Sequence, residues 1–205
     1  VADFNGRFAG RATIDTVEGK ASSAEQVHRL ADTVAGEFTL YVEVPLDPDP
    51  APLVALIGAS RARAKVRTGG VTPEQIPPPS RIVHFMAACL AARVPFKATA
   101  GLHHLIRGEY PLTYEPDAPR AMMYGYLNVF SAAALLLAGH GAEVAERALR
   151  DTDPTAFGFE QERMRWRGFA VATDELRALR DVLATSFGSC SFREPVDELG
   201  HLTAA

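Results

Sequence analysis

The chain has 205 residues, of which 47% are hydrophobic, and a formal net charge of -4. These values are typical of a globular chain with a full core, and they argue against a basic surface that binds nucleic acid. The longest apolar stretch, 126–139, contains Asn128 and Ser131 and is too short to span a bilayer. The N-terminus has no signal-peptide pattern, and the two cysteines lack metal-ligand spacing, which favours a reduced cytoplasm.

Helices and strands are expected to alternate along the first half of the chain. One strand is predicted near the N-terminus, at 12–17, and residues 22–35 have apolar side chains at helical spacing behind a serine cap. Further strands and the helices between them are predicted, in chain order, at 38–45, 50–59, 64–70, 81–92 and 95–104. This alternation is typical of an α/β fold with a parallel sheet.

The second half opens with a long polar connection, 102–119, which in a compact domain is usually a lid or a binding loop. Two helices, an alternating strand, a third helix and a final strand-to-helix turn are predicted at 120–138, 143–150, 164–172, 174–183 and 187–195. No linker divides the chain. A single α/β domain over 1–205 is therefore expected, with 1–35 as an N-terminal strand and helix and 36–205 as a barrel-like core.

Four or five strands are too few for a closed (β/α)8 barrel, which needs eight strands and typically about 250 residues. An open sheet would leave unpaired edges, which proteins usually cover. We therefore expect a partial TIM-barrel-like parallel sheet that another chain completes, in a heterodimer or alternatively a homodimer.

Two lysines occupy matching points of two consecutive predicted strands, Lys65-Val-Arg-Thr-Gly and Lys97-Ala-Thr-Ala-Gly. Because strand side chains alternate, Lys65 and Arg67 share one face, as do Lys97 and Thr99, and Glu43 is equivalent on the preceding strand. Charges inside buried strands are costly unless they face a polar pocket. We expect a net positive pocket for phosphate, sulfate or carboxylate, with a purely structural ion-pair network as the alternative.

Nucleophilic or basic groups are also expected at this pocket. A lysine beside other cations loses its proton more easily, so Lys97 could instead form a Schiff base in an aldolase or lyase. His103 and His104 follow the Lys97 strand at the end where α/β active sites lie, and one of the two could be a general base. The pair lacks the spacing of a metal site, and we expect neither metal nor cofactor.

Two further segments complete the predicted site. Ser189, Cys190 and Ser191 precede a helix start, where their hydroxyls and N–H groups could cradle an oxyanion or simply cap the helix. Cys190 would be a nucleophile only with a His or a cation nearby. Asn128, within an apolar helix, could reach the pocket or equally fill a core position.

Five separated motifs resemble, in order, those of a family of largely uncharacterised actinobacterial TIM-barrel-like proteins. They are Tyr41-Val-Glu-Val-Pro45, Lys65-Val-Arg-Thr-Gly-Gly70, Pro95-Phe-Lys-Ala-Thr-Ala-Gly-Leu-His-His104, Gly125-Tyr-Leu-Asn-Val129 and Ser186-Phe-Gly-Ser-Cys-Ser191. Members are typically longer at the N-terminus. A shorter member that needs a partner also looks like a subunit of the two-protein aziridine-forming enzymes of azinomycin-type antibiotic biosynthesis.

This resemblance implies a cofactor-independent lyase or cyclase acting on a sulfate or phosphate ester, with an amine of the same molecule closing on the carbon. Lys65, Arg67 and Lys97 would suit the leaving oxyanion, and the amine would be deprotonated by Glu43, by an acidic residue of the Asp47/Asp49 loop, or by His103 or His104. The alternatives are the Lys97 aldolase and a non-catalytic scaffold subunit. The expected partners are an anionic small molecule and a second chain, without nucleic acid or membrane.

Overall fold

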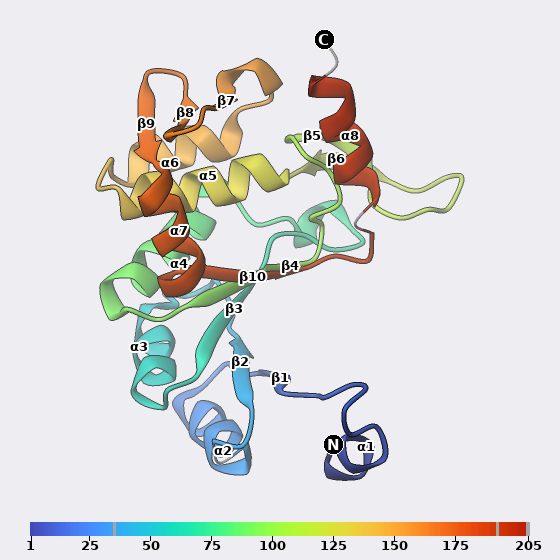
Figure 1. Cartoon of the computed structure of the whole chain (residues 1–205), viewed down its shortest axis with the longest axis vertical. Coiled ribbons are helices and arrows are strands. Elements are labelled where there is room, and N and C mark those ends of the chain that lie inside the picture. The colour runs from blue at the N-terminus through green and yellow to red at the C-terminus, as the bar shows by residue number, and fades with distance from the viewer. Residues whose placement is uncertain (35, 192, 204–205) are drawn as a thin grey trace.

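A computed structural model of the chain describes residues 1–34, 36–191 and 193–203. Its centre is a five-stranded parallel sheet of order β1-β2-β3-β4-β10 (Figure 1). The strands are β1 (Thr16–Lys20), β2 (Thr39–Glu43), β3 (Arg63–Arg67), β4 (Phe96–Thr99) and β10 (Ala184–Gly188). The predicted α/β class with a partial barrel-like parallel sheet is therefore confirmed.

The helices between the strands cover one face of this sheet. They are α2 (Ala24–Val34), α3 (Ala51–Ala59), α4 (Pro79–Ala92) and α7 (Thr173–Val182). Strands β1 to β4 lie side by side in sequence order, and connections between parallel strands are right-handed, so successive crossovers in one direction place the helices on one side. Figure 1 shows these helices along the left-hand side of the strands. The strand side chains that face them are small or apolar and buried: Val42, Ala64, Val66, Phe96 and Ala98.

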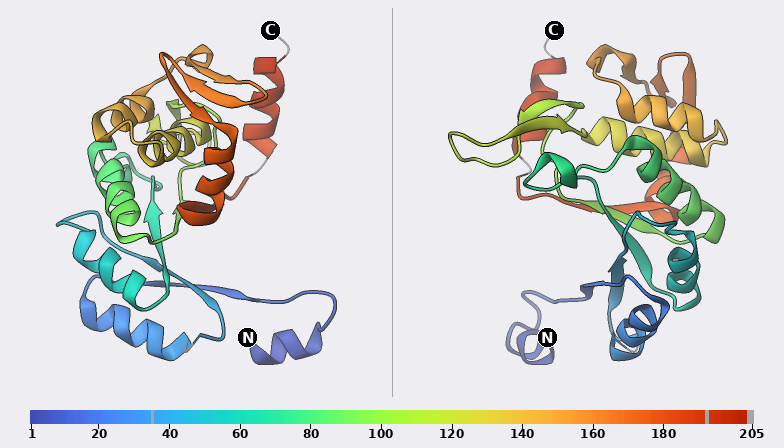
Figure 2. Two further views of the ribbon diagram at one scale, coloured as in Figure 1. Left: turned by 60° about the vertical axis from the view of Figure 1, so that its left-hand side comes forward. Right: turned by 180° about the vertical axis from the view of Figure 1, so that it is seen from behind.

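A long insertion separates β4 from β10. It contains the antiparallel hairpin β5 (Gly108–Pro111) and β6 (Arg120–Met123), and the helices α5 (Tyr126–Leu137) and α6 (Ala142–Arg150). An antiparallel sheet of β7 (Phe157–Phe159), β8 (Arg163–Trp166) and β9 (Phe169–Ala172) follows. Helices α5 and α6 pack on α4. Figure 2 shows this insertion at the end of the molecule opposite to β1 and α2.

The remaining helices lie near the ends of the chain or are short. Helix α1 (Ala2–Arg7) has no buried residue, and Figure 1 shows it apart from the sheet. Helix α8 (Arg193–Thr203) follows β10. Two 3-10 helices span Pro73–Gln75 and Pro154–Ala156.

Three predicted elements were wrong in type or position. Residues 120–123 form a strand paired with β5 rather than the start of a helix, which begins only after Gly125. The single strand predicted at 164–172 is a hairpin, because Arg167 adopts a left-handed turn conformation with φ of 50°. The strand predicted at 12–17 lies at 16–20, and this shift changes which charges face the site.

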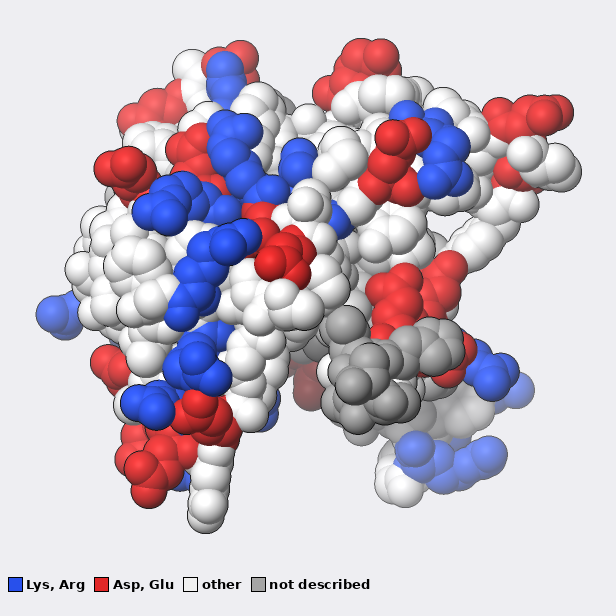
Figure 3. All heavy atoms as spheres, turned by 90° about the horizontal axis from the view of Figure 1, so that it is seen from above, with Lys and Arg blue, Asp and Glu red and all other residues white. Residues whose placement is uncertain are grey.

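The surface shown in Figure 3 carries acidic and basic side chains side by side. On β8, for example, Arg163 and Arg165 both pair with Glu160. Within the described residues, no helix combines the length and the apolar character that crossing a membrane would require.

Candidate functional site

The face of the sheet turned away from the helices is lined by charged side chains. Parallel pairing sets Lys20 beside Glu43, Glu43 beside Lys65, and Lys65 beside Lys97. Residues that are paired in register on neighbouring strands point to the same face of a sheet. These four side chains therefore share one face and lie at one level of the sheet. Four neighbouring strands therefore bring one row of charges together, as predicted for Glu43, Lys65 and Lys97.

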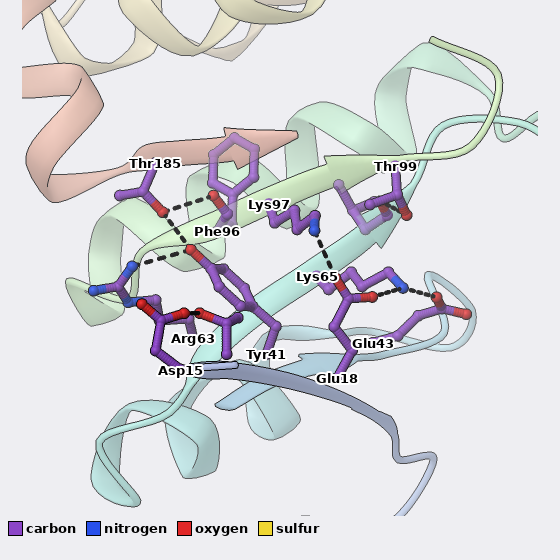
Figure 4. Close-up of polar contacts among 12 residues, drawn as sticks. Asp15, Glu18, Tyr41, Glu43, Arg63, Lys65, Phe96, Lys97, Thr99 and Thr185 are labelled. Carbon is purple, nitrogen blue, oxygen red and sulfur yellow. Dashed lines mark hydrogen bonds and ion pairs between the residues drawn. The ribbon is translucent and has the colours of Figure 1, made fainter. Parts of the chain in front are cut away.

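Ion pairs join this row into one network, shown in Figure 4. Glu18 on β1 bridges two lysines, with its carboxylate oxygens 2.6 Å from Lys97 Nζ and 2.5 Å from Lys65 Nζ. Lys65 Nζ is also 3.1 Å from Glu43 Oε2, and Lys20 Nζ is 3.2 Å from Glu43 Oε1. We call these five residues the lysine network. Three ammonium groups face two carboxylates in it, so it carries one formal positive charge.

The lysine network contains every lysine of the chain. The sequence has three lysines, at positions 20, 65 and 97, and all other strong cations are arginines. The side chains of Lys65 and Lys97 are only 12% and 16% exposed. A lysine ammonium is a compact, strongly hydrated charge, and its burial is costly without compensating partners. Lys20 is exposed, at 73%, but the gathering of all three lysines on one face, two of them sheltered, points to a specific electrostatic role for that face.

The pKa values of Lys65 and Glu18 are shifted by groups of opposite charge within the network. Burial opposes the charged form of Lys65, but hydrogen bonds to Glu18 and Glu43 outweigh burial and raise its pKa above the usual value. Burial likewise opposes ionisation of Glu18, whose pKa is nevertheless lowered by hydrogen bonds from Lys65 and Lys97. At neutral pH Lys65 is therefore an ammonium and Glu18 a carboxylate. The sequence-based idea that neighbouring cations would deprotonate a lysine does not apply to Lys65.

A second polar group lies along the same face, toward the start of the strands. Tyr41 Oη is 3.0 Å from Thr185 Oγ1 on β10, and Arg63 Nη1 donates to Tyr41 Oη at 3.0 Å (Figure 4). Lys97 Nζ lies 5.8 Å from the centroid of the Tyr41 ring, within reach of a cation–π contact. Tyr41 is buried and so forms one wall beside the lysine network.

At the other end of the network, the carboxyl ends of the strands border a cleft of about 900 Å³. Its lining includes Lys20 and Glu43 of the network and Arg67, which is exposed. Among the described residues no carboxylate forms an ion pair with Arg67, so its guanidinium is available to a ligand. Thr99, in register with Arg67, is buried, and its hydroxyl donates to Val66 O at 3.4 Å. The cleft thus joins the lysine network to an available arginine.

The two adjacent histidines have different surroundings. The His103 ring lies beside Cys190, with Sγ 3.4 Å from Nδ1 and 3.6 Å from Nε2, and Glu194 Oε2 is 3.6 Å from Nδ1. His104 instead stacks on Tyr110 at 3.4 Å between ring centroids, and its Nδ1 is 2.6 Å from a carboxylate oxygen of Glu198. Of the two histidines, only His103 contacts a nucleophilic side chain.

The other predicted residues around Cys190 are engaged locally. The Ser189 hydroxyl donates to Ser191 O at 2.6 Å, and Ser191 N donates back to the Ser189 hydroxyl at 3.3 Å. Gly188 lies against Lys97, since a Cβ at this glycine would be 3.7 Å from Lys97 Nζ. The Ser189–Ser191 turn therefore holds Cys190 close to the last residues of the lysine face.

Asn128 does not reach the site. It is fully buried, its side-chain amide donates to Ala148 O at 2.8 Å and Asp151 O at 2.7 Å, and its Oδ1 accepts from Arg107 N at 2.7 Å. These three backbone groups use its hydrogen-bonding capacity. The placement of Asn128 among anion-binding residues is corrected: it joins the helical insertion internally.

Sequence reasoning missed Glu18 and Lys20 because it placed the first strand several residues too early. The segment Thr16-Val-Glu-Gly-Lys20 alternates small or charged residues and has only one large apolar side chain. The charge pattern could have located this strand. Glu18 and Lys20 are two residues apart, and residues two apart in a strand point to the same face. The missing carboxylate made the predicted pocket too positive.

Within the described residues, no group of three or more His, Cys, Asp and Glu side chains is arranged to hold a metal ion. Comparison of the chain with family models, with curated proteins and with solved structures gave no match.

Proposed function

We propose that the chain is a cofactor-independent enzyme subunit that binds an anionic small molecule and assists departure of its sulfate or phosphate group. In the proposed reaction an amine of the substrate forms an N–C bond as the C–O bond breaks, giving an aziridine, and a protein base takes the amine proton. The oxyanion leaves with the bonding pair. The resemblance to aziridine-forming proteins suggests natural-product biosynthesis in a bacterium as the setting.

One observation carries this proposal: all three lysines of the chain meet on one face of the sheet, Lys65 and Lys97 sheltered and Lys20 exposed, beside Arg67 and an open cleft. Negative charge develops on the leaving oxygen as the C–O bond breaks, and fixed cations in a desolvated site stabilise that charge strongly. Lys65 and Lys97 supply these cations. Arg67 supplies a planar fork suited to an anion at the cleft.

The carboxylates supply the second requirement, a group that accepts the amine proton. Glu43 is buried and lies between two lysines, and Glu18 lies between Lys65 and Lys97. When an anionic group enters and takes over the lysine contacts, a carboxylate is released to bind the substrate ammonium. The substrate anion takes the place of the carboxylate beside the lysines, so the ammonium groups keep a negatively charged partner. We assign Glu43 and Glu18 as candidate bases, with His103 as the alternative.

The proposal includes a second protein chain and a cytoplasmic setting. The sheet ends at β1 and β10, each with one neighbour among the described strands, and a partner's strands would complete it. Both cysteines are unpaired, which suits a reducing compartment.

A 2-aminoalkyl sulfate ester is the simplest probe of this chemistry, with inorganic sulfate release measured by ion chromatography. The chain, with its partner where one is found, should release sulfate faster than buffer does. Lys65→Met, Lys97→Met and Arg67→Met should each lower this rate at least about tenfold, because each removes a cation from the leaving group. Arg29→Met, on the outer surface of α2, is the matched control and should leave the rate unchanged.

Borohydride reduction in the presence of a carbonyl substrate distinguishes the Schiff-base alternative from the proposed reaction. Peptide mass spectrometry can assign a reduced adduct to one of the three lysines, all of which belong to the network. A reduced adduct on Lys97 would support an aldolase or lyase instead. Sulfate release that is unchanged in all three cation variants would overturn the proposal and favour a scaffold subunit.

A further inference from the structure

A second reactive centre lies beside the lysine network, where three segments distant in sequence meet. Cys190 comes from the turn after β10, His103 from the loop after β4, and Glu194 from the first turn of α8. The contacts run from Cys190 Sγ to the His103 ring at 3.4 and 3.6 Å, and from His103 Nδ1 to Glu194 Oε2 at 3.6 Å. A nucleophile, a base and a carboxylate that orients the base are the parts of a covalent catalytic site.

Tyr114 contacts two members of this arrangement. Tyr114, from the loop of the β5–β6 hairpin, donates its hydroxyl to Glu194 Oε2 at 3.1 Å, and its ring packs edge-on against His103 at 6.4 Å between centroids. The His103 side chain is only 19% exposed, whereas Cys190 is exposed. The base is thus sheltered while the thiol is open to a substrate.

The other cysteine provides a contrast within the same chain. Cys89 lies on α4, is completely buried, and has its pKa raised by burial. A buried thiol in apolar surroundings is inert because the reactive thiolate is disfavoured. Cys190 alone combines exposure with an adjacent imidazole.

We propose that Cys190 is a catalytic nucleophile that takes an acyl group from an activated small-molecule acyl donor, with His103 as its general base and Glu194 positioning His103. The donor is a thioester or an acyl phosphate, both of which present an electrophilic carbonyl and a good leaving group. Lys97 packs against Gly188, two residues before Cys190, and we assign it the role of stabilising the negative charge that develops on the carbonyl oxygen.

The proposed reaction has two balanced steps. In the first, Nε2 of His103, 3.6 Å from Sγ, takes the thiol proton while Nδ1–H faces Glu194. Sγ bonds to the acyl carbon, the bond to the leaving group breaks, and the leaving group receives that proton. In the second, His103 takes a proton from water as its oxygen attacks the thioester carbon. The C–S bond then breaks, the sulfur regains the proton, and a carboxylic acid departs.

The experiment measures thiol reactivity on the full chain and needs no sulfate ester, so its failure is distinct from failure of the proposed function. Iodoacetamide at neutral pH, followed by peptide mass spectrometry, should alkylate Cys190 and leave Cys89 unmodified. Acetyl phosphate and p-nitrophenyl acetate should add one acetyl group to Cys190, and Cys190→Ser should abolish that adduct.

Two matched substitutions on α8 distinguish a role of Glu194 in positioning His103 from a general effect of the packing of α8. Glu194→Gln should slow alkylation and acetylation of Cys190 several-fold, and His103→Asn at least about tenfold, because general-base assistance is lost. Glu198→Gln, one helical turn further on, disturbs the docking of α8 on His104 and Leu105 N but not the thiol, and should leave both rates within about twofold of wild type.

Equal rates in His103→Asn and the native chain would overturn the proposal. So would equal slowing in Glu194→Gln and Glu198→Gln, which would show that α8 docking alone controls access to the thiol. Acetylation confined to the lysines, unchanged in Cys190→Ser, would also refute it. Circular dichroism of each variant checks that the rates refer to folded protein.

Discussion

At the scale of single residues, Glu18 decides the character of the site. Without Glu18, three ammonium groups would share the single carboxylate of Glu43. The Glu18 carboxylate reaches Lys65 and Lys97 across β2, and so gives Lys97 a partner and Lys65 a second one. Buried like charges repel strongly, so β4 and β3 could not present Lys97 and Lys65 side by side without such a bridge. The same bridge is what an incoming anion has to replace.

Because the pKa of Glu18 is lowered in the folded protein, the free energy of unfolding depends on pH in the acid range. Its unfolded pKa is near 4.5, and the folded value lies below it, so the unfolded chain binds more protons as the pH falls. The free energy of unfolding should hold above about pH 4.5 and decrease as the pH falls through the folded pKa. Urea unfolding from neutral pH to about pH 3 measures this.

Glu18→Gln should flatten this acid slope in part, because Asp151, whose pKa Arg167 lowers against the effect of burial, contributes with the same sign. Glu115→Gln removes an exposed carboxylate and is the matched control. An acid slope in Glu18→Gln as steep as that of Glu115→Gln would contradict the prediction. At alkaline pH Lys65 has the opposite sign, since its raised pKa gives stability that is lost as the pH rises through it.

At the scale of elements, the segments after β4 show where local patterns mislead. Residues 120–123 have helix-forming side chains, yet they pair with β5 and form a hairpin whose loop carries Tyr114 to Glu194. The following helix begins only where Gly125 makes an extended bridge to His104. Strand pairing at a distance overrides a weak helical preference.

Gly125 is the tightest point of this connection. A Cβ there would lie 2.4 Å from the Ile106 Cα and carbonyl carbon, which are backbone atoms that cannot rotate away. Gly125→Ala should therefore push the 104–106 loop outward and destabilise the protein by about 1–3 kcal/mol, measured by urea unfolding. Gly168→Ala, where nothing lies within 4 Å of the added Cβ, is the control. Equal stabilities of the two variants would show that the loop accommodates the methyl group.

At the scale of the whole molecule, the sheet resembles part of a barrel wall with a charged inner face. In a closed barrel, side chains from all strands fill the interior. Here the five strands form one part of such a wall, and their inward side chains would fill one part of the interior. Their outer face is covered by helices and their inner face is bordered by an open cleft. The two outermost strands, β1 and β10, each have one pairing partner among the described residues.

This architecture predicts association with a second chain. Light scattering after size exclusion should give a mass above that of one 22.1 kDa chain, either alone or after mixing with the product of a neighbouring gene. Hydrogen exchange at the amides of β1 and β10 should slow on association, because new strands would pair there. A single-chain mass in every mixture, with unchanged exchange, would contradict the prediction.

Much of the site could be read from strand periodicity. Lys65, Lys97 and Glu43 were placed together because the side-chain period of two and the order of parallel strands fix which residues share a face. Two parts failed for local reasons. The first strand was displaced because its few apolar residues give a weak signal, and Asn128 was misplaced because an amide in an apolar helix satisfies core hydrogen bonds as readily as it binds a ligand.

The sequence by itself determined the α/β class, the succession of parallel strands and the convergence of Lys65 and Lys97, since these follow from short-range patterns that repeat along the chain. Tertiary structure alone decided that Glu18 pairs with Lys65 and Lys97, that His104 contacts Glu198, and that His103 lies between Cys190 and Glu194. These contacts join residues far apart in the chain. Their geometry depends on how the insertion between β4 and β10 folds back, and no local periodicity encodes that.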